Sequence, residues 1–288
     1  MSKDVLHTIQ MNMGSFSKGQ KRIALYILEN YDKAAFMTAN KLGKAVNASE
    51  STVVRFATAL GFEGYPSMQR DLQEMIRTKL TSIQRIQASG ERYQSGNVME
   101  AVLQADMNKI HQTIDEADRQ EFDKAVEMLL SAKRIYILGV RSSTFLAGYL
   151  HFYFRNLFEN VTLIQDSSAG SILEQMMRIG PGDVIIGITF PRYSNSTATA
   201  IQFAYDRGAK VIAITDSELS PLCRYASATI MAQCEMISFV DSMVAPLSLI
   251  NALIVAAGHR KNKDLSNNFT ELERIWEDYG VFERIEHE

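Results

Sequence analysis

Apolar residues in the amino-terminal part of the chain recur at three- and four-residue steps, a spacing that is typical of amphipathic helices. In the stretch TANKLGKAVNASESTVVRFATAL, residues 38–60, the side chains of Leu42, Val46, Val53 and Phe56 fall at intervals that let two short helices share one small core. This stretch therefore predicts a helical hairpin.

The residues between and after these two helices favour one particular hairpin. Gly43 stands where the helix axes would cross closely, and Asn47 stands at the turn, where a left-handed backbone is required and Asn tolerates it. Ser49 would cap the second helix, which would end at Gly61 followed by the apolar Phe62. The pattern predicts a helix-turn-helix.

One face of the second helix is polar. Ser51, Thr52 and Arg55 would emerge beside its amino terminus, away from the apolar stripe, where they could enter a DNA major groove. An ordinary helical hairpin without a DNA partner is the alternative interpretation of the same pattern. The candidate DNA contacts are Lys18, Lys41, Ser49, Ser51, Thr52, Arg55 and Tyr65.

Flanking signals outline an all-helical DNA-binding domain of residues 1–80. Ser17 and Gln20 form a capping box for a first helix that would brace the helix-turn-helix. Residues 81–97 are polar and contain two glycines, which indicates a linker. Residues 98–288 would then form the second domain.

The second domain is predicted to open with an amphipathic helix. Asn97 and Glu100 form another capping signature, and Met99, Met107 and Ile114 belong to one apolar stripe at helical spacing. This stripe either packs on the domain that follows or helps the protein to dimerise.

Further along, the pattern changes to short apolar runs that alternate with helical segments. The runs have strand length and strand composition. Strand, crossover and strand in repetition predict a five-stranded parallel sheet with helices on both faces, closed by helices over residues 239–258 and 271–285. The predicted strands are residues 134–138, 161–164, 183–188, 210–215 and 228–231.

Ligands of such sheets bind beyond the carboxyl ends of the strands, where the strand order reverses. The loop after the first strand reads GVRSS and the loop after the third reads ITFPRYSNST, so both are rich in hydroxyl groups. Each leads into a helix amino terminus, whose backbone N–H groups and dipole favour an anion. The loops predict a phosphate cradle, with ordinary N-capping serines as the alternative. The candidate ligand contacts are Gly139, Arg141, Ser142, Ser143, Thr189, Arg192, Ser194 and Thr197.

Composition and charge fit a two-domain globular protein with a basic first domain. The chain of 288 residues is 46% hydrophobic and 22% charged, which argues against fibrous and disordered classes. The net charge of −3 divides unevenly, because residues 1–80 carry 11 Lys and Arg against 7 Asp and Glu, or +4, and the remainder carries −7. The basic part coincides with the helix-turn-helix, and a positive surface attracts a phosphate backbone.

Cysteine usage and hydropathy indicate a reduced, cytoplasmic protein. Cys223 and Cys234 lack a CxxC spacing and have no histidine cluster beside them, so neither a metal nor another cofactor is predicted. The amino terminus has no apolar signal core, and the longest apolar run, residues 245–257, is too short to span a bilayer. We expect no membrane role.

Four runs carry a resemblance to a known family: SESTVVRFATALGFEGY, IYILGVRSS, GPGDVIIGITFPRYSNST and RGAKVIAITDSELSPL. In this order, across both predicted domains, they resemble the RpiR family of bacterial transcriptional regulators, which join a helix-turn-helix to a sugar isomerase (SIS) domain. The resemblance implies that the recognition helix binds operator DNA, whereas the SIS domain binds a phosphorylated sugar or related metabolite and mediates oligomerisation. The positions that match the SIS phosphate loops are Ser142, Ser143, Thr189 and Ser194.

The chain departs from the pattern of many SIS loops, GxGxS and SxSGxT. Arg141 and Arg192 stand where glycines are usual, and Phe190-Pro191 interrupts the second hydroxyl row. We hypothesise that the arginines increase the demand for negative charge through bidentate contact to phosphate or carboxylate. The alternative is that they point outward into surface salt bridges.

These observations favour a metabolite-responsive DNA-binding regulator, a homodimer or homotetramer for which no catalytic residue is predicted. A phosphosugar isomerase or lyase with a helical appendage is the second interpretation, and Glu174, Asp241 and His259 are available in type as its acid–base groups. The third interpretation is a protein-interaction module without a DNA target.

Overall fold

The computed structural model describes residues 5–79, 81–90, 97–166, 168–236 and 238–282. The chain divides into two compact units. Unit 1 contains residues 1–105 and 235–242, and unit 2 contains residues 106–234 and 243–288. The boundary therefore falls inside one helix, α8, Val98–Glu116, and the chain returns once from unit 2 to unit 1.

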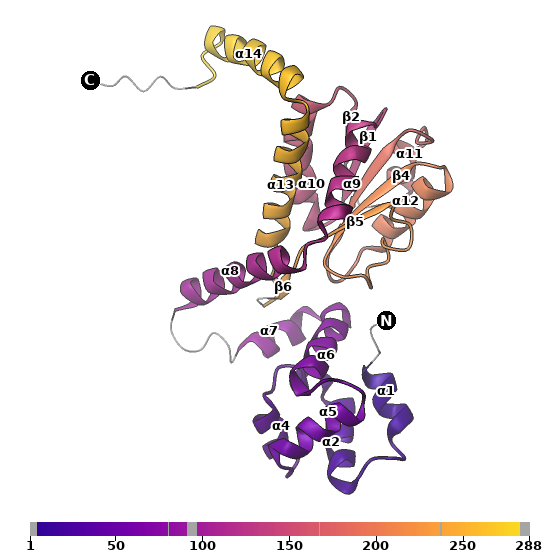
Figure 1. Ribbon diagram of the computed structural model, residues 1–288, viewed down its shortest axis with the longest axis vertical. Coiled ribbons are helices and arrows are strands. Elements are labelled where there is room, and N and C mark those ends of the chain that lie inside the picture. The colour runs from indigo at the N-terminus through magenta and orange to yellow at the C-terminus, as the bar shows by residue number, and fades with distance from the viewer. Residues whose placement is uncertain (1–4, 80, 91–96, 167, 237, 283–288) are drawn as a thin grey trace, which may run out of the picture. The chain divides into compact units, whose positions relative to one another are not determined.

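Unit 1 is helical apart from one short antiparallel hairpin (Figure 1). Its elements are α1 Val5–Asn12, α2 Lys18–Glu29, α3 Tyr31–Ala34, α4 Ala39–Ala45, α5 Glu50–Ala59, α6 Tyr65–Lys79, α7 Ser82–Gly90, β6 Glu235–Met236 and β7 Asp241–Ser242. Leu42, Val53 and Phe56 are fully buried in one core with Ile23 and Ile27 of α2. This core confirms the all-helical amino-terminal domain and its shared apolar stripe.

Helix α7 occupies much of the segment that its polar composition suggested as a linker, while residues 91–96 lie outside the described residues. Thr81 and Gln84 form a reciprocal cap, because the Thr81 N–H donates to Gln84 Oε1 over 3.0 Å and the Gln84 N–H donates to Thr81 Oγ1 over 3.3 Å. The next residue, Arg85, is 2% exposed and pairs with Asp241 at 2.9 Å. A distant acidic partner thus allows a basic residue to be buried here.

Unit 2 contains a five-stranded parallel sheet in the order β2-β1-β3-β4-β5. This topology confirms the predicted α/β fold. The strands are β1 Ile135–Gly139, β2 Val161–Ile164, β3 Val184–Ile188, β4 Lys210–Thr215 and β5 Ala228–Met231. The connecting helices are α9 Arg119–Leu130, α10 Ser143–Leu157, α11 Ala169–Gln175 and α12 Asn195–Asp206, and the closing helices are α13 Val244–Arg260 and α14 Asn262–Asp278.

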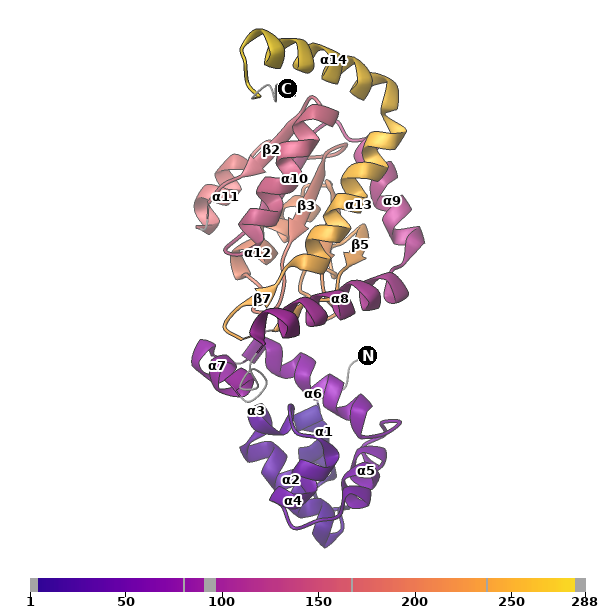
Figure 2. The same cartoon turned by 90° about the vertical axis from the view of Figure 1, so that its left-hand side faces the viewer.

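Alternate strand residues face opposite layers of helices, so both faces of the sheet are buried. Ile137 and Ile186 belong to the core formed with α9, α10 and α13, whereas Leu138 and Ile185 belong to the core formed with α11 and α12. Figures 1 and 2 show these helix layers on the two sides of the sheet.

Several predicted boundaries were wrong. Helix α13 starts at Val244 rather than at residue 239, because Asp241 and Ser242 pair in the hairpin of unit 1. Helix α14 begins at Asn262, immediately after α13, rather than at residue 271.

The part of the α8 apolar stripe that belongs to unit 2 is exposed. Met107 and Ile114 are 53% and 66% exposed. Thr113, on another side of the helix, is buried and accepts a hydrogen bond from the Gln233 N–H over 2.9 Å. Helix α8 therefore contacts unit 2 through a different face, and a dimer contact through the stripe stays a prediction.

Candidate functional site

The turn of the helix-turn-helix has the predicted geometry. Asn47 is left-handed, with φ of 52°, and its carbonyl accepts a hydrogen bond from Arg22 Nη2 over 2.7 Å. A Cβ atom on Gly43 would lie 2.7 Å from the Ala48 carbonyl oxygen, so only glycine allows α4 to approach this closely. Helix α5 ends at Ala59 with Leu60 as its C-cap, and Gly61 follows with the left-handed φ of 87°.

The amino terminus of α5 presents a cluster of hydroxyl groups. Ser49 caps the helix, and its Oγ lies 2.9 Å from Ser51 Oγ and 2.8 Å from Thr52 Oγ1. Ser49, Ser51 and Arg55 are exposed, and Arg55 makes no hydrogen bond or ion pair with the described residues. These side chains form a polar face at the start of the candidate recognition helix.

Two predicted lysine contacts lie on neighbouring helices. Lys18 opens α2 and is exposed. The position of a Cβ on Gly19 would lie 3.4 Å from Thr52 Cγ2, so the first turn of α2 contacts the first turn of α5. Lys41 is exposed on α4. The first turn of α2, which Lys18 opens, therefore lies beside the first turn of α5.

Tyr65 is a correction to the set of DNA contacts. Its side chain is 4% exposed, and its hydroxyl donates to the Met37 carbonyl oxygen over 2.7 Å. Burial raises the pKa of Tyr65 to about 12. The residue anchors α6 to the segment before α4 and is not presented to DNA. The sequence did not predict this burial, because Tyr65 directly follows a turn and no local pattern marks it as a core residue.

The second candidate site lies at the carboxyl ends of β1 and β3, the adjacent strands between which the strand order reverses. The register pairs Gly139 of β1 with Ile188 of β3, so the loops that follow them start side by side. The structure thereby brings together the two hydroxyl-rich loops that the sequence indicates.

In the first loop, helix α10 approaches the strand very closely. A Cβ on Gly139 would lie 2.4 Å from the Ser143 carbonyl oxygen, which makes glycine necessary at this position. Ser142 is the N-cap of α10, but its side chain makes no capping hydrogen bond, and it is exposed. The Ser142 hydroxyl is therefore not used to satisfy the helix terminus, whereas Ser143 is buried.

In the second loop, the hydroxyl groups hold the start of α12. The Ser194 N–H donates to Thr189 Oγ1 over 3.4 Å, and the Thr197 N–H donates to Ser194 Oγ over 3.3 Å. Thr197 is fully buried, yet its Oγ1 has no hydrogen-bond partner among the described residues. An orphaned buried hydroxyl costs free energy unless a partner meets it, so it marks a place where a ligand oxygen would be stabilised.

Two arginines of these loops have left-handed backbones. Arg141 has φ of 60° and Arg192 has φ of 65°, and both side chains are exposed. A residue with a Cβ pays about 1–2 kcal/mol for this conformation, whereas glycine pays nothing. The positions where SIS loops usually have glycine are thus glycine-like in geometry but not in residue type.

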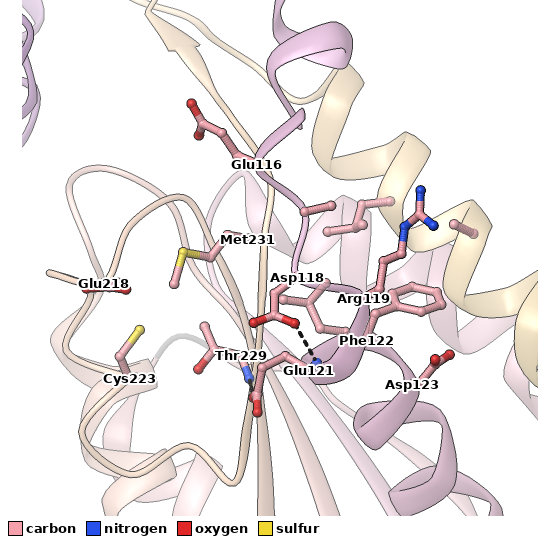
Figure 3. A pocket seen from close by; sticks show the side chains of 14 residues that line it. Glu116, Asp118, Arg119, Glu121, Phe122, Asp123, Glu218, Cys223, Thr229 and Met231 are labelled. Atoms are coloured by element: carbon pink, nitrogen blue, oxygen red, sulfur yellow. Dashed lines mark hydrogen bonds between the residues drawn. The ribbon is translucent and has the colours of Figure 1, made fainter. Parts of the chain in front are cut away.

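A separate cavity of about 900 Å³ lies between the start of α9 and the edge strand β5 (Figure 3). Its rim is acidic, but the carboxylates of Asp118 and Glu121 have structural partners. Asp118 caps α9, and Glu121 Oε2 accepts the Thr229 N–H over 2.9 Å, which lowers the pKa of Glu121. Burial raises the pKa of the Cys223 thiol in this cavity, so it is not an activated nucleophile.

The acid–base groups of the enzyme interpretation do not gather at the sheet edge. Glu174 is exposed on α11, His259 is exposed on α13, and Asp241 belongs to unit 1, where it pairs with Arg85. Among the described residues, no group of His, Cys, Asp and Glu is arranged to hold a metal ion. Within the same residues, no helix has the length and hydropathy to cross a membrane.

Two family models match the chain. A helix-turn-helix domain of the rpiR family matches residues 3–79, and a SIS domain matches residues 128–256. An uncharacterised HTH-type transcriptional regulator of Caldanaerobacter subterraneus is 30% identical over 270 residues, which cover 91% of this chain and 93% of the relative. The transcriptional regulator HexR of Escherichia coli is 24% identical over 274 residues, with 92% and 91% covered.

Solved structures share the fold. The NanR protein of Vibrio vulnificus, complexed with ManNAc-6P, has a TM-score of 0.60 at 21% identity and covers 98% of this chain and 100% of its own. The sugar isomerase domain of an RpiR transcription factor from Sphaerobacter thermophilus has a TM-score of 0.59 at 23% identity, covering 62% of this chain and 98% of its own.

Proposed function

Since this chain belongs to the RpiR family of helix-turn-helix transcriptional regulators with a SIS domain, we propose that a small anionic metabolite controls its affinity for operator DNA. The metabolite is of the phosphosugar class and binds between the β1–α10 and β3–α12 loops. The chain acts as a homodimer or homotetramer and performs no reaction.

The buried hydroxyl of Thr197 is the observation that carries this proposal. It lies in the first turn of α12, one of two helix amino termini at adjacent strand ends, and it has no partner among the described residues. Helix dipoles, free backbone N–H groups and hydroxyl donors all favour an anion there. The match of NanR, whose structure holds a phosphorylated aminosugar, supports the same ligand class.

The DNA half of the proposal rests on α5. Its exposed Ser51 and Arg55, beside Lys18 of α2, present donors and positive charge at a helix amino terminus. In a dimer, two such helices would read half-sites about 34 Å apart, one turn of DNA. Operator affinity changes when the metabolite binds one arrangement of the subunits better than the other, by the difference in its two binding free energies.

Calorimetric titration with a panel of sugar phosphates and sugar acid phosphates tests the ligand half. A Thr197→Val variant removes the orphaned hydroxyl at constant shape, and we expect it to weaken binding about fivefold or more, as for a lost hydrogen bond. Ser266→Ala, which removes an exposed hydroxyl on α14, is the matched control and should bind like the wild type. Equal affinities of wild type and Thr197→Val would contradict the proposed site.

Fluorescence anisotropy with a labelled duplex from the upstream region of the gene tests the DNA half. Arg55→Ala should weaken binding, and the affinity should fall steeply with salt because phosphate contacts release counterions. Arg224→Ala is the control, since Arg224 is an exposed arginine of unit 2. Equal loss in both variants, or binding insensitive to salt, would contradict the role of α5.

A further inference from the structure

The described residues contain three non-glycine residues with a left-handed backbone: Asn47, Arg141 and Arg192. Asn47 is explained by its turn, because Asn tolerates this conformation and Arg22 binds its carbonyl. The other two are both arginines, and both follow the adjacent strands β1 and β3 at the proposed ligand site. A guanidinium group is therefore carried by a strained backbone in each of the two loops that follow these adjacent strands.

Arginine is an unfavourable residue type for the backbone conformation at both positions. Glycine would adopt the same backbone without strain, and an exposed side chain contributes little packing. Backbone strain persists where the surrounding structure enforces it, and such residues concentrate at ligand sites. Arg141 immediately precedes the N-cap of α10, and Arg192 lies two residues before the N-cap of α12. Both side chains thus start at the rim of the same cradle.

The inner cradle and the rim differ in chemistry. The inner cradle is the start of α12, where the Thr197 hydroxyl has no partner among the described residues and the helix amino terminus favours one phosphate. The guanidinium groups at the rim are full charges on long stems that match carboxylate or phosphate in a planar, bidentate manner. Tyr193, which lies between Arg192 and Ser194, holds the β3–α12 loop in place, because its hydroxyl donates to Asp216 Oδ1 over 3.0 Å.

We propose, building on the proposed function, that the effector carries a second anionic group, a carboxylate or another phosphate, which Arg141 and Arg192 bind while the cradle holds the first phosphate. The ligand class is then a phosphorylated sugar acid or a sugar bisphosphate rather than a sugar monophosphate. The arginines determine specificity and are not needed to bind the phosphate itself.

A matched ligand series tests this proposal on the full chain by calorimetry. Glucitol 6-phosphate, 6-phosphogluconate and glucitol 1,6-bisphosphate differ at one end only, which is neutral, a carboxylate or a phosphate. Glycerol 3-phosphate and 3-phosphoglycerate repeat the first comparison in a shorter chain. We expect at least one ligand with two anionic groups to bind about tenfold more tightly than the matched ligand whose other end is neutral, a factor that corresponds to about 1.4 kcal/mol. The tighter binder of 6-phosphogluconate and glucitol 1,6-bisphosphate shows whether the second anionic group is a carboxylate or a phosphate.

The variants Arg141→Gly and Arg192→Gly separate specificity from folding. Each removes a guanidinium and relieves the left-handed strain, so we expect the thermal midpoint to stay level or rise while the tenfold preference shrinks towards one. Affinity for glucitol 6-phosphate and glycerol 3-phosphate, which carry one anionic group only, should change less than threefold. Arg224→Gly, at an exposed arginine outside the two loops, should keep the preference.

The possible failures are distinct. If the wild type binds ligands with one and with two anionic groups equally tightly, the second anion site is overturned, whereas the proposed phosphate site in the cradle is retained. A glycine variant that loses all ligands equally would show that the arginines serve the first phosphate, which also overturns this inference. If none of the five ligands binds, both the inference and the proposed phosphosugar site are overturned.

Discussion

Replacing Asp241 by Asn tests whether one buried ion pair holds the β6–β7 hairpin and α7 together within unit 1. Arg85 Nη1 donates to both carboxylate oxygens of Asp241 at 2.9 Å. The Arg85 side chain is 2% exposed, and that of Asp241 is 15% exposed. The substitution keeps the shape of the side chain and removes the negative charge that Asp241 places against the buried Arg85 guanidinium.

The expected loss in the free energy of unfolding depends on which charge of the pair remains buried in the variant. Breaking a buried pair by removing one partner costs about 3–5 kcal/mol, and an arginine cannot shed its charge. Because the Asn carbonyl still accepts one hydrogen bond, we expect a loss of about 3 kcal/mol for Asp241→Asn. Arg85→Met leaves the less buried carboxylate, and we expect about 2 kcal/mol. The double variant should be more stable than Asp241→Asn alone, because the buried charge is then gone.

Urea unfolding followed by two probes measures these losses. Trp276 in α14 is the sole tryptophan of the chain, so its fluorescence reports on unit 2, while circular dichroism follows the whole chain. The control is Glu127→Gln, which breaks the shorter but exposed Arg260–Glu127 pair at 2.6 Å and should cost below about 1 kcal/mol. An Asp241→Asn loss no larger than the control, or a double variant with additive losses, would refute the reasoning.

Three further predictions concern single residues. Burial raises the folded-state pKa of Tyr65 to about 12, so the neutral phenol contributes its full stabilisation below about pH 10, and this stabilisation is lost between about pH 10 and 12. We expect the free energy of unfolding of Tyr65→Phe, measured by urea unfolding at a series of pH values, to lack this fall between pH of about 10 and 12. Glu121→Ala should cost about 1 kcal/mol by uncapping the Thr229 N–H, and this difference should fade as acid protonates the wild-type carboxyl, whose pKa is lowered; an unchanged difference in acid would contradict the role of its charge. Gly43→Ala should destabilise unit 1 by about 1–3 kcal/mol and weaken duplex binding, because the added Cβ meets the Ala48 carbonyl oxygen; a wild-type thermal midpoint would contradict the close approach.

Local chemistry explains what the sequence predicted well. Asn47, Gly43 and Gly61 each report a backbone requirement of their own position, so the helix-turn-helix could be inferred without knowledge of the rest of the chain. The five strands are short apolar runs between polar turns, and a parallel order followed from the helices between them. The two candidate ligand loops could be singled out because strand order and helix termini place such loops by rule, and the structure confirms that they follow adjacent strands.

Features that depend on distant partners could not be predicted. Arg85 lies in a polar stretch, and its burial requires Asp241, 156 residues later, which no local pattern reveals. Tyr65 follows a turn in a basic domain and looked exposed, but the Met37 carbonyl accepts its hydroxyl. The left-handed backbone at Arg141 was hidden for a related reason, since the residue type argues against the conformation that the loop imposes.

In the proposed mechanism, the segments that connect the two units are candidates for carrying the effect of the bound effector to the DNA-binding helices. The chain passes between them within α8 and again on each side of the hairpin of residues 235–242, which follows the edge strand β5 and precedes α13. Within unit 1, the hairpin is tied to α7 by Arg85 and Asp241. If this tie contributes to the coupling, Asp241→Asn should reduce the ratio of operator affinities measured with and without effector more than it reduces effector affinity itself. A variant that stays folded and keeps the full ratio would exclude this tie from the coupling.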